Sequence, residues 1–544
     1  MHEHHAHESA PLLRLEQLAV AYDGRSAVED VTFGVAPGEV LALVGESGSG
    51  KTTTVQAVIG LLPGSGRVVS GRILLGDEDI ARWSSRRLDS LRGKRISLIP
   101  QDPASSLNPT RTIGSQVAEV FRLHGWRDRK AVRSKVLELL EHVGLSQPEL
   151  RLTQYPHELS GGMNQRVLIA MAVGLQPDLI IADEPTSALD VTVQKRILDL
   201  IDTLRREHGT AVLLVTHDLA VAAERAERIA VMQRGRIVEI GPAQHILTAP
   251  QHPYTQRLLS DAPALAAPPQ RSVRPKGDIV IRVENLVQNF PTVGKESFRA
   301  LDGVSFEVVR GTTHALVGES GSGKTTTARA VVGLLRPTSG RITVGGQRVT
   351  ELRGESLRQF RRGVQLVYQN PYRSLDPRQT VWQTVAEPLG NFERLSRAER
   401  SERVGSVLER VQLSPDLYHR RPAALSGGQR QRVAIARALV LKPRVLILDE
   451  AVSALDVTVQ AQILRLLGEL QQVDGLTYLF VSHDLAVVRA IADTVSVLKN
   501  GVQLEHGSVR EVFAAPKADY TRHLISSIPG RKAAVQTLEL GAFS

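Results

Sequence analysis

The chain contains no cysteine, and aromatic residues make up only 4% of its 544 residues. Without cysteine, disulfide bonds, thiolate metal sites and cysteine-ligated iron–sulfur clusters are all excluded. No apolar run approaches the ~18–20 residues that a membrane-spanning helix needs, and no signal-peptide pattern stands out. We therefore expect a chain that does not cross a membrane unaided.

Positive charge is in excess, because 67 Lys and Arg residues outnumber 57 Asp and Glu and give a net charge of +10. Such a balance is compatible with nucleic acid or an anionic membrane surface as a partner. The arginines, however, are scattered, and no dense basic block is interleaved with aromatic residues. We therefore expect solvated helix faces and phosphate-handling sites, and no nucleic-acid partner.

One eight-residue stretch, GESGSGKT, occurs at residues 45–52 and again at residues 318–325. It matches the phosphate-binding pattern G-x-x-x-x-G-K-[ST], whose glycines let backbone N–H groups turn toward a phosphate. In the first copy an apolar strand pattern over 40–44 precedes the loop, and a helical pattern over 53–60 follows it. The N-terminus of that helix directs partial positive charge at the phosphate. Two matches in this context predict nucleotide binding.

Within each copy the lysine, Lys51 or Lys324, is expected to reach the β- and γ-phosphates. The hydroxyl of the next residue, Thr52 or Thr325, is expected to take one Mg²⁺ coordination position. The loop residues predicted to bind the nucleotide are Gly45, Glu46, Ser47, Gly48, Ser49, Gly50, Lys51, Thr52 and Thr53 in the first copy, and Gly318, Glu319, Ser320, Gly321, Ser322, Gly323, Lys324, Thr325 and Thr326 in the second.

The duplication extends over almost the whole chain, as expected for a tandem repeat of two similar domains. Equivalent positions keep an identical separation at three pairs, namely Ser160 and Ser426, Asp183 and Asp449, and His217 and His483. Strand and helix patterns alternate within each copy, and a helical insert appears over 130–143. The predicted organisation is a tail at 1–10, a domain at 11–262, a proline-rich linker at 263–278, a domain at 279–530 and a C-terminal tail at 531–544. The four histidines of residues 1–10 also leave a weak metal-chelating tail open.

Each copy places a pair of carboxylates directly after a short apolar strand pattern. The strand pattern over 179–182 ends in Asp183 and Glu184, and the pattern over 445–448 ends in Asp449 and Glu450. Carboxylate oxygens suit Mg²⁺, so the aspartate is predicted to hold the metal shell. The glutamate is predicted to polarise the water that attacks the γ-phosphate.

Two further polar residues recur in each copy. His217 and His483 follow the next strand pattern, at the edge where open α/β sheets bind ligands, and they are predicted to contact the γ-phosphate. Gln101 and Gln369 stand ahead of proline-bearing loops and are predicted to touch the metal or the attacking water.

An aromatic residue ends the first strand pattern of each copy, Tyr22 in one and Phe290 in the other. Stacking on an adenine ring and ordinary core packing both explain an aromatic residue there. The sequence leaves the two interpretations open.

The most specific stretches are LSGGMNQR at 159–166 and LSGGQRQR at 425–432, each opening a long helical pattern. Serine, bare glycine N–H groups and a helix N-terminus together suit an anion. The residues predicted to bind the nucleotide in this way are Ser160, Gly161, Gly162, Ser426, Gly427 and Gly428. With these stretches the chain resembles the nucleotide-binding domains of ABC transporters over nearly its whole length, with every motif present twice.

The resemblance implies an α/β fold of tandem P-loop NTPase domains, each with a RecA-like parallel-sheet core, an antiparallel β subdomain and a helical subdomain. It implies ATP with Mg²⁺ as the ligands, and two ATP sites formed within one chain between its halves. One site would join Lys51, Asp183, Glu184 and His217 to Ser426 and Gly428. The other would join Lys324, Asp449, Glu450 and His483 to Ser160 and Gly162. Neither set carries a degenerate residue, so both sites are expected to hydrolyse ATP.

Within that family the stretches QDPASSLNP at 101–109 and HPYTQRLL at 252–259 look like those of dipeptide, oligopeptide and nickel importers. Such a resemblance implies two integral-membrane permease subunits and an extracytoplasmic solute-binding protein as partners, with the chain at the cytoplasmic face of the membrane. Some members carry a cysteine cluster after the HPYT stretch, and this chain has none. Peptide is the expected solute, and nickel or a metallophore is an alternative. A less favoured alternative is a soluble tandem ATPase that acts on ribosomes or nucleic acid.

Overall fold

A computed structural model describes residues 10–187, 189–265, 277–292, 295–369, 374–453 and 455–530. The described residues form two compact units, the first comprising most residues up to Leu265 and the second most residues from Gly277 to Ile528. Nearly all of the expected tails at 1–10 and 531–544, and most of the expected linker at 263–278, lie outside the described residues. The domain boundaries therefore stay predictions.

The first unit begins with an antiparallel sheet of strand order β2-β1-β4-β5. Its strands are β1 Leu13–Tyr22, β2 Arg25–Val35, β4 Arg67–Leu75 and β5 Glu78–Asp79. The alternating sequence that predicts a strand from Leu12 to Tyr22 buries one face of β1, including Leu13, Leu15 and Val20.

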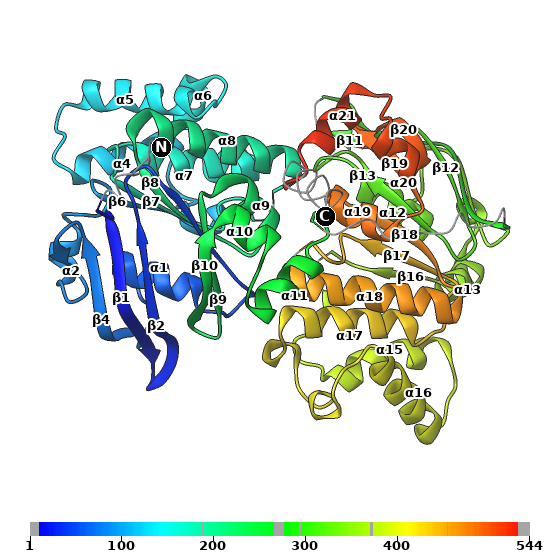
Figure 1. Cartoon of the computed structure of the whole chain (residues 1–544). Helices are drawn as coiled ribbons and strands as arrows, with labels where there is room; N and C mark the ends of the chain where they lie inside the picture. Colours follow the sequence, from blue (N-terminus) through cyan, green and yellow to red (C-terminus); the bar gives the residue numbers. More distant parts are fainter. Residues whose placement is uncertain are drawn as a thin grey trace, which may run out of the picture. The chain divides into compact units, whose positions relative to one another are not determined.

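A mostly parallel sheet of order β10-β9-β3-β8-β7-β6 forms the centre of the first unit (Figure 1). Its strands are β3 Val40–Val44, β6 Ile96–Ile99, β7 Leu179–Asp183, β8 Ala211–Thr216, β9 Arg228–Gln233 and β10 Arg236–Pro242. Strand β3 is buried throughout, as its continuous apolar sequence predicts for a strand covered on both faces. Leu41 and Leu43 pack with the antiparallel sheet and helix α1 (Lys51–Ile59), whereas Ala42 and Val44 pack on the opposite face.

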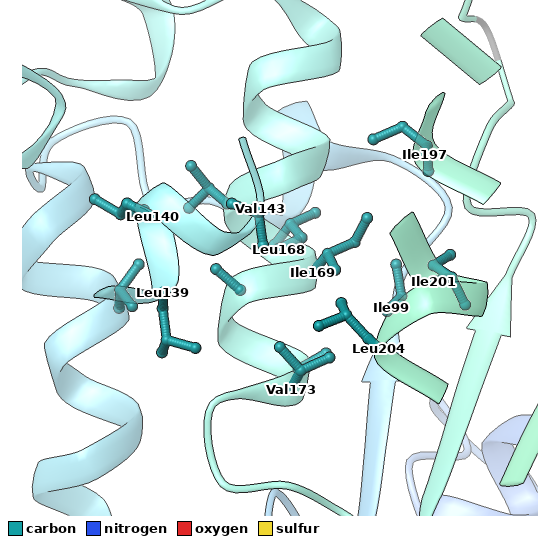
Figure 2. Close-up of a cluster of buried hydrophobic side chains, with 14 of the residues drawn as sticks. Ile99, Leu139, Leu140, Val143, Leu168, Ile169, Val173, Ile197, Ile201 and Leu204 are labelled. Carbon is teal, nitrogen blue, oxygen red and sulfur yellow. The ribbon is translucent and has the colours of Figure 1, made fainter. Parts of the chain in front are cut away.

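Other helices cover that opposite face. They are α8 Val191–His208, α9 Leu219–Arg225, α10 Ala243–Thr248 and α11 Pro253–Asp261. The predicted helical insert contains α4 Ile113–Leu123, α5 Arg129–His142, α6 Pro148–Thr153 and α7 Gly161–Val173, and the short segments α2 Ser85–Leu88, α3 Pro103–Ser106 and η1 Pro156–Glu158 complete the unit. Figure 2 shows how Leu139 and Leu140 of α5, Ile169 of α7 and Ile201 of α8 meet in one apolar cluster. The insert is thereby fastened to the parallel sheet.

The second unit repeats this architecture in one continuous sheet of order β15-β14-β11-β12-β20-β19-β13-β18-β17-β16. The strands are β11 Ile279–Thr292, β12 Lys295–Val309, β13 Thr313–Val317, β14 Ser339–Val344, β15 Gln347–Arg348, β16 Val364–Val367, β17 Val445–Asp449, β18 Thr477–Ser482, β19 Thr494–Lys499 and β20 Val502–Ser508. The pairing of Asp302 with Val502 joins the antiparallel strands to the parallel ones. The predicted α/β fold is confirmed in both units.

The helices of the second unit follow the same order. They are α12 Lys324–Val331, α13 Gly354–Gly363, α15 Val381–Phe392, α16 Arg397–Arg410, α17 Gly427–Leu439, α18 Val457–Asp474, α19 Leu485–Ile491, α20 Val509–Ala514 and α21 Asp519–Ser526, with short 3₁₀ turns at Val349–Glu351, Pro415–Leu417 and Pro422–Ala424. Across the described part of the chain, none of the helices combines the length and the apolar character needed to span a membrane.

Candidate nucleotide site

The phosphate-binding loop of the first unit connects strand β3 to helix α1, as predicted. Gly50 caps the helix with φ at 105°, a left-handed conformation that favours glycine. A Cβ atom on Gly45 would lie 2.2 Å from the carbonyl oxygen of Met232, so no side chain fits there. Buried Ser49 Oγ has no hydrogen-bond partner among the described residues, so it remains available to a ligand in the loop. The second unit repeats the loop geometry, and there a Cβ on Gly318 would lie 2.1 Å from the carbonyl oxygen of Leu498, but Ser322 Oγ accepts a hydrogen bond from Lys324 Nζ at 3.4 Å.

The loop lysines are buried in the cradle that they are predicted to serve. Lys51 Nζ donates hydrogen bonds to the carbonyl oxygens of Gly45 at 2.7 Å and Glu46 at 2.9 Å. Lys324 Nζ makes the equivalent bonds to Gly318 and Glu319, both at 2.8 Å. Burial lowers the pKa of Lys324 although the carboxylates of Glu450 and Asp449 act against it. Each lysine ammonium therefore lies inside the loop, where a phosphate would meet it.

The threonine and the first carboxylate lie together in each unit. Thr52 Oγ1 donates to Asp183 Oδ1 at 3.4 Å, and Thr325 Oγ1 donates to Asp449 Oδ1 at 3.0 Å. Burial, followed by the charge of Glu184, raises the pKa of Asp183 to about 6, and burial also raises the pKa of Asp449. A hydroxyl and a carboxylate are the hard oxygen ligands that Mg²⁺ accepts from proteins while keeping water and phosphate in its shell. The residues present therefore fit the predicted metal.

The second carboxylate is the centre of a small polar cluster. In the first unit Glu184 accepts a hydrogen bond from Gln101 Nε2 at 2.9 Å, and His217 Nδ1 lies 3.1 Å from its other oxygen. Burial raises the pKa of Glu184, but His217, Lys51 and Gln101 outweigh it and lower the pKa overall. Burial lowers the pKa of His217, and the hydrogen bond and charge of Glu184 outweigh it and raise the pKa. The glutamate is thus held ionised.

The second unit builds the same cluster around Glu450. Gln369 Nε2 donates to Glu450 Oε2 at 2.7 Å, and His483 Nδ1 lies 3.4 Å from that oxygen. The pKa of Glu450 is lowered, and that of His483 raised, by the same opposing causes. Both glutamates adopt positive φ, 45° at Glu184 and 47° at Glu450, which is uncommon for a residue other than glycine.

The LSGG serines cap helices, as the sequence predicts. Ser160 Oγ accepts a hydrogen bond from Met163 N at 3.3 Å at the start of α7. Ser426 Oγ accepts from Gln429 N at 3.3 Å, and the Gln429 side chain accepts from Ser426 N at 3.0 Å. The serines are exposed, and the glycines that follow them, Gly161, Gly162, Gly427 and Gly428, form the first turns of the helices. Their contribution to a nucleotide site stays a prediction.

The two aromatic residues differ in burial. Tyr22 packs partly against the core of the antiparallel sheet, and a Cβ on Gly66 would lie 2.5 Å from its ring. Phe290 is 37% exposed on β11. Core packing thus accounts for much of Tyr22, and stacking on adenine stays a prediction for both residues.

The hydroxyls of two tyrosines contact the phosphate-binding loops, although the sequence alone predicts no role for them. Tyr254 Oη accepts a hydrogen bond from Glu46 N, and Tyr520 Oη accepts one from Glu319 N, both at 3.1 Å. The available signal was their equivalent place in the two copies, within HPYT at 252–255 and ADYT at 518–521.

Comparison with known proteins adds the family. Residues 28–187 and 301–453 match the ABC transporter family, and residues 238–289 match the oligopeptide/dipeptide transporter C-terminal region. The chain is 44% identical over 542 residues to the glutathione import ATP-binding protein GsiA of Pectobacterium atrosepticum, covering 92% of this chain and 86% of that protein. It is 44% identical over 529 residues to the peptidoglycan transport ATP-binding protein YejF of Agrobacterium fabrum, covering 95% and 96%.

A solved structure supports the fold over most of the chain. An archaeal ribosome recycling factor, aABCE1, determined with the archaeal ribosomal stalk protein aP1, superposes with a TM-score of 0.62 over 91% of this chain and 90% of that one, at 22% identity. At that identity the likeness concerns the fold alone. The family matches and the identity to the relatives lead to one conclusion: the chain belongs to the ABC transporter family and is an ATP-binding, ATP-hydrolysing protein with two ABC domains.

Proposed function

We propose that this chain is the ATPase subunit of an importer for peptide-type solutes. The observation that carries the proposal is the match of residues 238–289 to the oligopeptide/dipeptide transporter C-terminal region. The names of the relatives agree with it, since one is a glutathione import protein and the other a peptidoglycan transport protein. Peptide bonds are common to these solutes, so a short peptide is the expected cargo class.

Each domain contributes one set of hydrolytic residues. In the first, Lys51 and the loop N–H groups hold the β- and γ-phosphates, and ionised Glu184 accepts the proton of the attacking water. His217 and Gln101 hold the glutamate in place through their contacts of 3.1 and 2.9 Å. Mg²⁺, held by Thr52 and Asp183, would supply positive charge to the phosphate oxygens. Lys324, Thr325, Asp449, Glu450, His483 and Gln369 do the same in the second domain.

We further infer that each set is completed by the serine and glycines of the other domain. An exposed serine at a helix N-terminus, with bare glycine N–H groups beside it, suits a γ-phosphate. Ser426, Gly427 and Gly428 would then serve the ATP at Lys51, and Ser160, Gly161 and Gly162 the ATP at Lys324. ATP binding closes the two halves, and hydrolysis releases them.

The chain requires membrane partners for transport, and we propose two permease subunits at the cytoplasmic face, with an extracytoplasmic solute-binding protein. A groove of about 230 Å³ in the second unit suits a permease segment, and its walls are β16, α15 and α17. Leu334 and Tyr368 are 47% and 44% exposed at this groove, and Arg437 pairs with Glu387 inside it. Tyr368 directly precedes Gln369, which bonds Glu450, so a segment seated here would act on the hydrolytic cluster.

Co-purification of the intact chain from its native membrane tests the proposal. We expect two multi-span permeases and a solute-binding protein that carries a bound peptide. Reconstituted with those permeases, the ATPase should be stimulated by the peptide-loaded binding protein. Recovery of ribosomes or nucleic acid without a permease would overturn the importer assignment, and a binding protein loaded with nickel or a metallophore would overturn the cargo class.

A further inference from the structure

The C-terminal element of each unit reaches back to its own phosphate-binding loop through one tyrosine, buried in the first unit and half-buried in the second. In the first unit Tyr254, on α11, is 5% exposed, and its hydroxyl lies 3.1 Å from Glu46 N. That N–H belongs to the residue that follows Gly45. The carbonyl of Glu46 accepts the 2.9 Å hydrogen bond from Lys51 Nζ. The tyrosine and the catalytic lysine therefore hold the two sides of one loop residue.

The second unit shows the same contact with a different surrounding sequence. Tyr520, on α21, accepts from Glu319 N at 3.1 Å, and the Glu319 carbonyl accepts from Lys324 Nζ at 2.8 Å. HPYT has become ADYT between the two copies, so the tyrosine and the threonine remain while the first two residues differ. Preservation of the contact through that change separates it from incidental packing.

A glutamate carboxylate, half-buried in the first unit and buried in the second, fixes the start of each tyrosine-bearing helix. Glu239 of β10 accepts hydrogen bonds from Gln251 N at 2.8 Å and His252 N at 3.1 Å. Glu505 of β20 accepts from Lys517 N at 2.9 Å and Ala518 N at 3.1 Å. Burial raises the pKa of both glutamates. The N–H groups, with the hydroxyls of Thr255 and Thr521, outweigh burial and lower the pKa overall, so both carboxylates are ionised. The glutamate of the strand thus fixes the position of the helix, and the helix places its tyrosine against the loop.

A cation lies beside each ring. The Arg257 guanidinium lies 5.5 Å from the ring centroid of Tyr254 and pairs with the Glu46 carboxylate at 2.9 Å. Lys499 Nζ lies 4.6 Å from the ring centroid of Tyr520. Burial raises the pKa of Tyr520 to about 12, so its hydroxyl stays protonated at neutral pH. A neutral phenol can accept the loop N–H and hold the ring against the cation at the same time.

We propose that Tyr254 and Tyr520 are positioning residues for ATP binding, each setting the first peptide of its phosphate-binding loop so that the lysine and the following N–H groups converge on the phosphates. Helix α11 in the first domain and helix α21 in the second then directly influence nucleotide affinity. The proposal rests on the ATP-binding activity and not on the identity of the cargo, and it is tested without any membrane partner.

The test is equilibrium binding of MgADP and of MgATP to the full chain, by calorimetry or a fluorescent nucleotide analogue. Tyr254→Phe and Tyr520→Phe each delete one hydroxyl. One net hydrogen bond corresponds to about a fivefold change in affinity. We expect each single variant to lower nucleotide affinity by that factor at one of the two sites of the chain. The double variant should lower the affinity at both sites. In a steady-state assay KM for ATP should rise more than kcat falls.

Tyr478→Phe is the matched control. Tyr478 is fully buried and its hydroxyl donates to Leu467 O at 2.8 Å, so the variant also loses a buried hydrogen bond, but one without contact to the loop. It should lower the melting temperature and leave nucleotide affinity unchanged. If Tyr254→Phe and Tyr520→Phe behave like Tyr478→Phe, with lower stability and unaltered affinity, the positioning role is wrong. Failure of the importer assignment would leave these affinities untouched.

Discussion

The two units carry the same predicted catalytic side chains on different cores. In the second unit His314 stands where the first unit has Leu41, at the second residue of the central strand. Its ring is fully buried and stacks on Phe306, with Nδ1 2.8 Å from Thr494 Oγ1 and Nε2 3.0 Å from Ser496 Oγ. In the first unit Leu41 lies in a cluster of buried apolar side chains.

Beside these differences the predicted hydrolytic clusters keep the same residues, although glutamine and histidine contact different oxygens of Glu184 and the same oxygen of Glu450. The contacts from glutamine and histidine to the central glutamate differ by only a few tenths of an ångström between the units. The comparison teaches that short contacts near the strand ends keep the site geometry. The core below can be rebuilt as long as each buried polar group finds a partner.

The strongest test of this equivalence is removal of the glutamates. We expect Glu184→Gln and Glu450→Gln each to impair turnover strongly, and the double variant to lose about 10²–10³-fold, because the amide cannot accept the proton from water. MgATP binding should persist. Turnover in the intact transporter measures the effect, with exposed Glu149→Gln as control. A single variant with full transport-coupled hydrolysis would show that the two sites are not equally competent.

A histidine at the equivalent position of the first unit should lower the free energy of unfolding. Leu41→His would bury an imidazole where the flanking strand offers Arg228 and Ala230 in place of Thr494 and Ser496. Without hydroxyl partners the free energy of unfolding of the first unit should fall by about 2–4 kcal/mol. Denaturant unfolding measures this change, and Leu41→Met serves as the volume-matched control. Equal stability of the two variants would contradict the argument.

Buried His314 also predicts a dependence of folding stability on pH that Leu41, its counterpart in the first unit, cannot cause. Burial, with a smaller contribution from His506, lowers the pKa of His314 to about 3. Below pH 6.5 the unfolded chain takes up a proton that the folded second unit does not, so stability is lost as pH falls from about 6.5 toward 3. His314→Leu should flatten this loss, and between pH 6.5 and 5 the wild type should lose about 1–2 kcal/mol more than the variant. Parallel curves would show that His314 does not titrate on unfolding.

The smallest effect concerns the helix caps. In the second unit Ser426 and Gln429 exchange two hydrogen bonds, whereas Met163 occupies the glutamine's position in the first unit. Met163→Gln should give Ser160 the same pair of reciprocal hydrogen bonds, a capping box, and raise the stability of α7 by about 0.5–1 kcal/mol. Thermal unfolding of the full chain measures the gain, and Met163→Leu is the control that lacks the amide. No difference between these two variants would contradict the prediction.

Local motifs explain how much of this was predictable. The strand before the first loop ends where the sequence predicts it, and the predicted helix over 130–143 is α5, Arg129–His142. The P-loop lysines, carboxylates, histidines and glutamines converge because parallel strands present their carboxyl ends along one edge. Contacts across long sequence separations carry no such signal. Tyr254 lies 208 residues from Glu46, and the partners of His314 lie 180 and 182 residues from it.

The positive φ at Glu184 and Glu450 limits how either site can be lost in evolution. A left-handed backbone accepts asparagine, aspartate and glycine readily and excludes β-branched residues. Descendants that abandon hydrolysis at one site are therefore expected to carry a small polar residue or glycine there, and not valine or isoleucine. Such a replacement would preserve the backbone at the end of the strand. A site that no longer hydrolyses ATP can therefore still bind it.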